Sequence, residues 1–123
     1  MKRVKLEGMS VQQMVQRFIA IALEQDEALL MNDIAEVSRL FWQLEAVEEE
    51  LKVREGDQRR ALLPLYEHPN MQVRLKAVKA TLAVAPDTAR RMLQAIADSR
   101  EYPQAGEAGM SIDNLALGIF KPT

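Results

Sequence analysis

The stretch that decides the fold spans residues 62–82 and reads LLPLYEHPNMQVRLKAVKATL. It opens with leucines at helical spacing, and His68-Pro69 followed by asparagine then marks a turn and a helix cap. Small residues recur after the turn at Ala77 and Ala80, where their size lets two helices approach closely. The stretch therefore predicts two helices joined by a short turn.

Two longer helices are predicted upstream, over residues 10–30 and 33–55. Ser10 with Gln13 has the spacing of a capping box, and Asp33 with Glu36 repeats it. Apolar residues recur at helical intervals in both segments. They are Val11, Met14, Val15, Phe18, Ala22 and Leu29 in the first, and Ile34, Val37, Leu40, Phe41, Leu44, Val47 and Leu51 in the second. The similar lengths and short connection predict an antiparallel hairpin.

The predicted helix over residues 58–66 begins after Asp57 and contains Pro64, which removes a backbone hydrogen bond and predicts a kink. A fourth helix is expected to end near residue 83. Pro86 then suits the first turn of a fifth.

The sequence pattern changes after residue 100. Residues 101–109 contain proline and two glycines, and their apolar residues follow no helical period. This predicts an ordered or semi-ordered loop, and then a short helix over residues 111–117 that Gly118 ends. We expect Ile119 and Phe120 to dock back onto the core.

These elements make the chain all-α, with about five helices plus a short C-terminal helix. We expect residues 1–9 to form a flexible extension and residues 10–123 a single domain. Within it, residues 10–55 form the long hairpin, residues 57–84 a repeat-like unit and residues 86–123 a degenerate capping unit.

Residues 62–82 resemble one HEAT repeat, with a leucine-rich first helix, a turn with proline, and Val73-Arg74 opening the second helix. The resemblance implies a right-handed α-α superhelix. HEAT repeats often carry aspartate before the turn, paired with the arginine, and here His68 stands in its place. The usual Asp–Arg pairing is therefore in doubt.

From about residue 10 onward, the chain also resembles a bacterial family of small HEAT-like proteins known only as a domain of unknown function. The resemblance rests on Gly56–Leu62, His68–Asn70, Val73–Ala77, Tyr102–Gly106, Gly109-Met110 and Gly118–Thr123. It implies a helical fold and a bacterial cytoplasmic setting, and it carries over no catalytic residue.

Charge is unevenly distributed along the chain. Residues 1–51 hold five Lys/Arg against ten Asp/Glu, whereas residues 52–91 hold nine against four. Such asymmetry is typical of a surface that meets a partner, or of two halves that complement each other. No cysteine is present, which excludes thiolate metal sites and disulfides. No run of eighteen apolar residues predicts a membrane helix, so we expect a cytoplasmic protein.

Neither a catalytic nor a cofactor or metal site is predicted. The only histidine, His68, lies in a turn and supplies one ligand at most. The acidic cluster on the second helix is interpreted as a solvated face. It consists of Glu45, Glu48, Glu49 and Glu50.

The candidate interaction surface combines one tryptophan with a stripe of cations that repeat helices would place on one face. Its members are Trp42, Arg54, Arg59, Arg60, Arg74, Lys76, Lys79, Arg90 and Arg91. Phe41 is expected to point inward, which leaves Trp42 at the edge of the helix, either packed over the hairpin seam or anchoring a partner.

The favoured function is a non-enzymatic module that binds another protein, with a homo-oligomer through the first two helices as one version. The alternative is nucleic-acid binding through the basic stripe on residues 54–91. The net charge of −2 and the scarcity of aromatic residues near the stripe argue against nucleic-acid binding.

Overall fold

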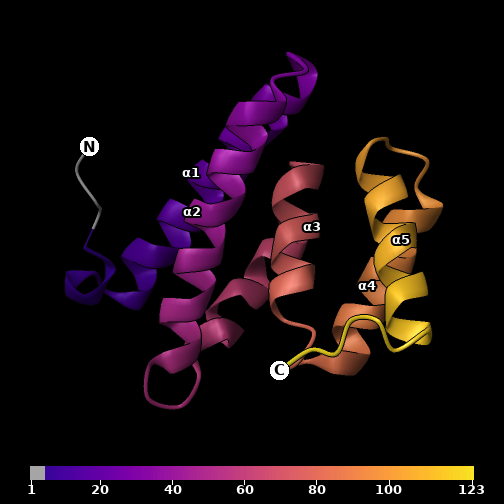
Figure 1. Cartoon of the computed structure of the whole chain (residues 1–123). Coiled ribbons are helices and arrows are strands. Elements are labelled where there is room, and N and C mark those ends of the chain that lie inside the picture. Colours follow the sequence, from indigo (N-terminus) through magenta and orange to yellow (C-terminus); the bar gives the residue numbers. More distant parts are fainter. Residues whose placement is uncertain (1–4) are drawn as a thin grey trace. The chain divides into compact units, whose positions relative to one another are not determined.

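Residues 5–123 are described in the computed structural model, and within this range every regular element is a helix and none is a strand (Figure 1). The predicted all-α class is therefore confirmed. The elements are the 3-10 helices η1 (Leu6–Gly8) and η2 (Gln58–Glu67) and the α-helices α1 (Val11–Leu30), α2 (Ile34–Val53), α3 (Met71–Ala80), α4 (Pro86–Asp98) and α5 (Gln104–Ala116). Two compact units divide the chain, residues 1–61 and 62–123. In the described range, no helix combines the length and apolar character needed to cross a membrane.

Helix α1 begins at the predicted capping box. The hydroxyl of Ser10 accepts the backbone N–H of Gln13 at 3.0 Å, and the Gln13 side chain accepts the N–H of Ser10 at 2.9 Å. These two bonds satisfy donors that the first helical turn leaves without partners. At the other end, Asn32 has a φ of 53°, a left-handed conformation that asparagine tolerates. The Asp33 carboxylate then accepts the N–H of Glu36 at 3.2 Å and starts α2.

The α1–α2 hairpin is antiparallel, as its lengths and short turn predicted (Figure 1). Both helices contribute side chains to its core. Each large side chain that is fully buried contributes roughly 1.5–3 kcal/mol to the free energy of folding. The buried side chains are Met14, Phe18, Ile21, Ala22, Gln25 and Ala28 from α1, and Leu40, Leu44, Val47 and Leu51 from α2. Two members of the predicted α2 stripe are exposed instead: Ile34 lies at the hairpin turn, and Phe41 borders the buried face.

Arg54 ties the start of unit 1 to the end of α2. Its Nε donates to the Glu50 carboxylate at 2.7 Å, while its Nη2 donates to the carbonyls of Leu6 at 3.0 Å and Met9 at 2.8 Å. A planar guanidinium can satisfy several acceptors at once in this way. Of the predicted extension over residues 1–9, residues 1–4 lie outside the described range, and Leu6–Gly8 form η1 beside this arginine.

The predicted α-helix over residues 58–66 is wrong in type, because the segment is the ten-residue 3-10 helix η2 with Pro64 inside it. Proline lacks an N–H, and in an α-helix its ring meets the carbonyl four residues earlier. A tighter 3-10 winding is one way for the chain to accommodate this residue without a break.

Helices α3, α4 and α5 form unit 2, in which α4 packs against α5 and α3 contacts both (Figure 1). The Asn70 side chain caps α3 by accepting the N–H of Val73 at 3.1 Å, as predicted. Ala77 and Ala80 are buried, as are Ala105 and Ala108 of α5, so small residues recur at the packed faces. Polar contact is also buried here, since Gln104 Nε2 donates to Gln72 Oε1 at 2.9 Å.

The loop predicted over residues 101–109 and the short helix predicted over residues 111–117 are wrong. A single helix, α5, runs from Gln104 to Ala116, and Ser111 is buried within it. Glycine in a helix interior costs up to about 1 kcal/mol relative to alanine, so its presence argued against a helix. Tertiary packing of Ala105 and Ala108 overrides that preference.

Gly118 ends α5 with a φ of 71°, as predicted. The carbonyl of Asn114 then accepts the N–H groups of Ile119 at 3.0 Å and Phe120 at 3.1 Å. The expected docking of these two side chains onto the core is wrong, because Ile119 is 71% exposed and Phe120 is 43% exposed. The two backbone hydrogen bonds to Asn114 hold this turn.

We expect Arg54→Ala to lower the free energy of unfolding by about 1.5–3 kcal/mol, because the substitution leaves partly buried carbonyls without their charged donor. Arg54→Lys should recover only part of this, since an ammonium cannot reproduce the planar set of contacts. Urea unfolding followed by circular dichroism measures both. Arg60→Ala is the matched control, as Arg60 is exposed. Equal effects of the Arg54 and Arg60 variants would contradict the assignment.

Candidate functional site

Helix α2 presents two neighbouring aromatic side chains to solvent. Trp42 is 68% exposed and Phe41 is 40% exposed. Their rings meet edge to face, with centroids 5.1 Å apart and an interplanar angle of 84°. This is a favourable geometry for an aromatic pair, so each ring restricts the other. The expectation that Phe41 points inward is wrong, because Leu40 and Leu44 occupy the buried face and place Phe41 at its border.

The aromatic pair belongs to a longer apolar surface on the same helix. Ile34 precedes Phe41 by seven residues and shares its side of the helix, while Val53 follows Trp42 by eleven and shares the side of Trp42, about 100° around. Both are exposed. We call this surface the α2 strip and define it as Ile34, Phe41, Trp42 and Val53. Exposed large apolar side chains that gather on one face mark interaction sites more often than scattered ones do.

Two acidic side chains, Glu45 and Glu49, lie between Trp42 and Val53 and form what we call the acidic border of the α2 strip. Glu45 follows Trp42 by three residues and Glu49 follows it by seven, so both share its side of the helix, and both are exposed. The prediction of a solvated acidic face holds for this pair alone. Glu50 is partly buried and binds Arg54, and Glu48 is partly buried as well.

Glu48 lies in an environment that disfavours its charge. Burial raises its pKa most, the negative charge of Glu45 adds to the rise and Arg59 acts in the opposite direction, so that the pKa lies at about 7. A carboxyl group with this pKa changes charge near neutrality, immediately beside the exposed acidic pair. The charge bordering the α2 strip therefore depends on pH.

The basic residues of unit 1 are largely engaged within the chain. Arg59 is buried and holds Asp57 through two bonds, Nε to Oδ1 at 2.9 Å and Nη2 to Oδ2 at 2.6 Å. Arg54 is engaged with Glu50 and the η1 carbonyls. Arg60 alone of the three predicted arginines in this unit is exposed.

In unit 2, Glu107 of α5 binds both predicted lysines of α3. Lys76 Nζ lies 2.9 Å and Lys79 Nζ lies 3.0 Å from Glu107 Oε2. Burial raises the pKa of Glu107, but the two ammonium groups outweigh it and hold that pKa below the ordinary value. The three side chains form an ionic link between α3 and α5, which uses both lysines inside the unit.

Arg74 and His68 lie around the turn before α3. Arg74 Nη2 approaches the Pro69 carbonyl at 3.5 Å, and its Nε is buried without a hydrogen-bond acceptor among residues 5–123. His68 Nδ1 accepts the backbone N–H of Asn70 at 3.0 Å, a contact typical of a turn residue. Arg90 and Arg91 are exposed on α4. The structure therefore engages at least four of the eight predicted cations with partners in their own unit.

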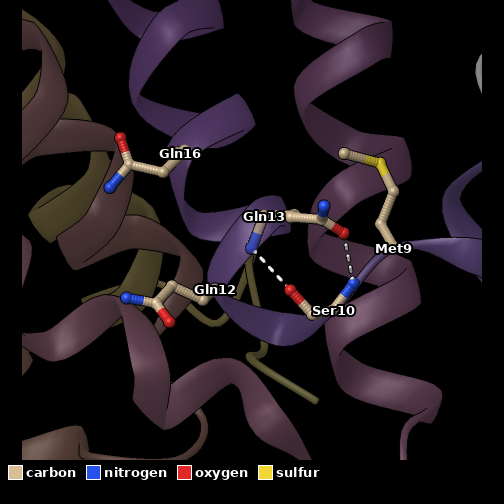
Figure 2. Close-up of a pocket in the computed structure, with 5 residues that line it drawn as sticks. All are labelled: Met9, Ser10, Gln12, Gln13 and Gln16. Atoms are coloured by element: carbon tan, nitrogen blue, oxygen red, sulfur yellow. Dashed lines mark hydrogen bonds between the residues drawn. The ribbon is translucent and has the colours of Figure 1, made fainter.

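A hollow lies at the start of α1 (Figure 2). It is lined by Met9, Ser10, Gln12, Gln13 and Gln16. Ser10 and Gln13 are already engaged in the capping box, as the dashed lines in Figure 2 show. The lining contains no ionisable side chain. In the described range, no group of three or more His, Asp or Glu side chains is arranged to hold a metal ion.

We expect Glu48→Gln to stabilise the protein increasingly as pH rises. Below about pH 4.5 the folded and unfolded states both carry the proton, so the substitution changes little. Between pH 4.5 and 7 the unfolded state loses it first, and native stability falls. Above pH 7 the variant should therefore gain on the order of 2 kcal/mol, from about 1.4 kcal/mol per pKa unit reduced for solvent access.

Urea unfolding at pH 4, 6 and 8 measures this difference. Glu49→Gln is the matched control. Glu49 neighbours Glu48 but is exposed, so this substitution should alter stability little at any pH. A Glu48→Gln effect of the same size at pH 4 and pH 8 would contradict the assignment.

Comparison with known proteins identifies the family of this chain. Residues 12–116 match the family described as "Domain of unknown function (DUF2019)". The chain is also similar to the protein RPA1889 from Rhodopseudomonas palustris CGA009, whose crystal structure it matches with a TM-score of 0.94. The two are 52% identical over 98% of this chain and 100% of that one. No curated protein matches the chain. By the extent of the family match, the chain belongs to the DUF2019 domain family.

Proposed function

We propose that this chain is a non-enzymatic module that binds a protein partner through the α2 strip. The observation that carries the proposal is the exposed Phe41–Trp42 pair on a well-formed helix. Tryptophan is enriched among the few residues that dominate binding energy at protein interfaces. A helix also presents it rigidly, so little conformational freedom is lost on binding. We place this activity in the bacterial cytoplasm, a setting that suits a chain without cysteine.

The surroundings of the pair support a protein surface over a small-molecule site. The α2 strip has exposed apolar side chains near both ends of the helix, at Ile34 and Val53, which suits an extended partner better than a compact ligand. Interfaces of this kind combine an apolar centre with a polar rim. Glu45 and Glu49 supply polar groups on the side of the helix that carries Trp42.

Nucleic-acid binding by residues 54–91 is the weaker alternative. Neutralising phosphates requires cations that are free to approach them. Arg54, Arg59, Lys76 and Lys79 instead hold carboxylates within their own units. A phosphate would have to displace those partners, which removes much of the gain.

As a finer description of the fold, we propose that residues 57–84 are a HEAT-type unit. The order of helix, proline-containing turn and capped second helix supports this, as do the buried small residues Ala77 and Ala80 on α3. The 3-10 winding of η2 departs from the usual first helix of such a unit.

We expect Trp42→Ala to abolish capture of a protein partner by the immobilised chain from a lysate of its source. Wild type and variant are compared at moderate salt, with bound proteins identified by mass spectrometry. Because Trp42 is exposed, the substitution should leave the fold intact, as circular dichroism checks. Met110→Ala removes an equally exposed side chain from α5 and serves as the control. Identical captured proteins from wild type and Trp42→Ala would refute the proposal.

We expect no salt-dependent binding of fluorescent DNA or RNA. Titrations at low and moderate salt, read by anisotropy, test this because phosphate contacts weaken as salt rises. Binding that falls with salt, and that is lost in an Arg60→Ala, Arg90→Ala and Arg91→Ala triple variant, would favour the alternative. These are the exposed predicted cations, so the variant spares the engaged ones.

A further inference from the structure

The acidic border of the α2 strip restricts what can cover it. If two copies paired strip to strip, Glu45 and Glu49 of one copy would approach the same residues of the other. Like charges brought together at an interface are unfavourable and suppress such pairings. The strip therefore calls for an occupant that combines apolar side chains with positive charge.

The chain itself carries a surface of this chemistry. Leu117 is 73% exposed, and Ile119 and Phe120 are exposed beside it. Lys121 follows and is also exposed, and residues 114–123 contain no aspartate or glutamate. We call Leu117–Lys121 the C-terminal apolar segment. Its apolar side chains and single cation complement the α2 strip and its acidic border.

Backbone geometry preorganises the C-terminal apolar segment. Gly118 turns the chain with a φ of 71°, and the Asn114 carbonyl holds the N–H groups of both Ile119 and Phe120. The two side chains therefore project from a formed turn instead of a free tail. A surface that is ordered before binding loses less conformational entropy when it binds.

We propose that the α2 strip of one copy binds the C-terminal apolar segment of a second copy. This rests on the proposed function, because it names the partner of the same surface. Ile119 and Phe120 pack against Phe41 and Trp42, and Lys121 faces the acidic border. The contact joins two different surfaces, so two copies either exchange segments reciprocally in a closed pair or continue into larger assemblies.

Trp42 is the only tryptophan of the chain and lies in the proposed interface, so its fluorescence reports directly on it. Light scattering across a concentration series should give a mass above that of the monomer. Over the same series, the Trp42 emission should shift to shorter wavelength as the ring leaves water.

Variants then assign the contact to these surfaces. Ile119→Asp and Trp42→Ala should each weaken self-association at least about tenfold, the effect of losing an interface anchor. Glu49→Lys and Lys121→Glu should each weaken it too. The double variant Glu49→Lys with Lys121→Glu should restore it, because the opposite charges are then exchanged. Met110→Ala, an exposed change outside both surfaces, should have no effect.

A protein that stays monomeric at every concentration overturns the inference. Self-association that Ile119→Asp and Trp42→Ala leave unchanged overturns it as well. The proposed function fails separately: if Trp42-dependent capture of another protein persists in a monomer, only the identity of the partner was wrong. If neither capture nor self-association depends on Trp42, both proposals fail.

Discussion

Helix α2 has to bury one face against α1 while its opposite face stays in water, and much of unit 1 depends on how its residues divide between the two. Leu40, Leu44, Val47 and Leu51 fill the buried face at helical spacing. With the rotation of the helix set by these four, Phe41 and Trp42 are carried outward by the geometry of the α-helix. Exposure of the aromatic pair is thus a direct consequence of how the core packs.

A second constraint acts on the charged residues, because each buried or partly buried charge requires a partner. Arg54 donates to the η1 carbonyls, Arg59 forms a salt bridge with Asp57, and Glu107 forms salt bridges with two lysines of α3. Each of these pairs lies within one unit, so at least four of the nine Lys/Arg of residues 52–91 bind carboxylates inside their own unit. The acidic border of the α2 strip differs, since Glu45 and Glu49 remain in solvent. It is the exposed charge, more than the total, that decides which partners a surface favours.

The differences between the predicted and the observed elements have specific physical causes. Residues 101–109 contain proline and two glycines, which argue against a helix, yet α5 forms because Ala105 and Ala108 pack into unit 2. The 3-10 winding of η2 was missed because Pro64 indicates a disturbed helix without indicating which winding results. Ile119 and Phe120 suggested a docked end because apolar residues usually bury, a tendency that surface residues regularly break. The candidate cations were identified by type, whereas Asp57 and Glu107 as their partners could not be inferred from spacing alone.

The sequence by itself determined the features that depend on local chemistry, namely where helices begin and end. The cap of Ser10 and Gln13, the left-handed Asn32, the Asn70 cap and the terminating Gly118 depend on residues within a few positions of one another. The all-α class and the antiparallel hairpin follow from such signals and from helical periodicity. Tertiary structure alone decided the rest: that Phe41 faces water together with Trp42, which cations are engaged, and that Glu48 lies where burial raises its pKa to about 7. These properties depend on groups that are distant in sequence or on the rotation of a packed helix. The local spacing of residues predicts neither the distant contacts nor the rotation.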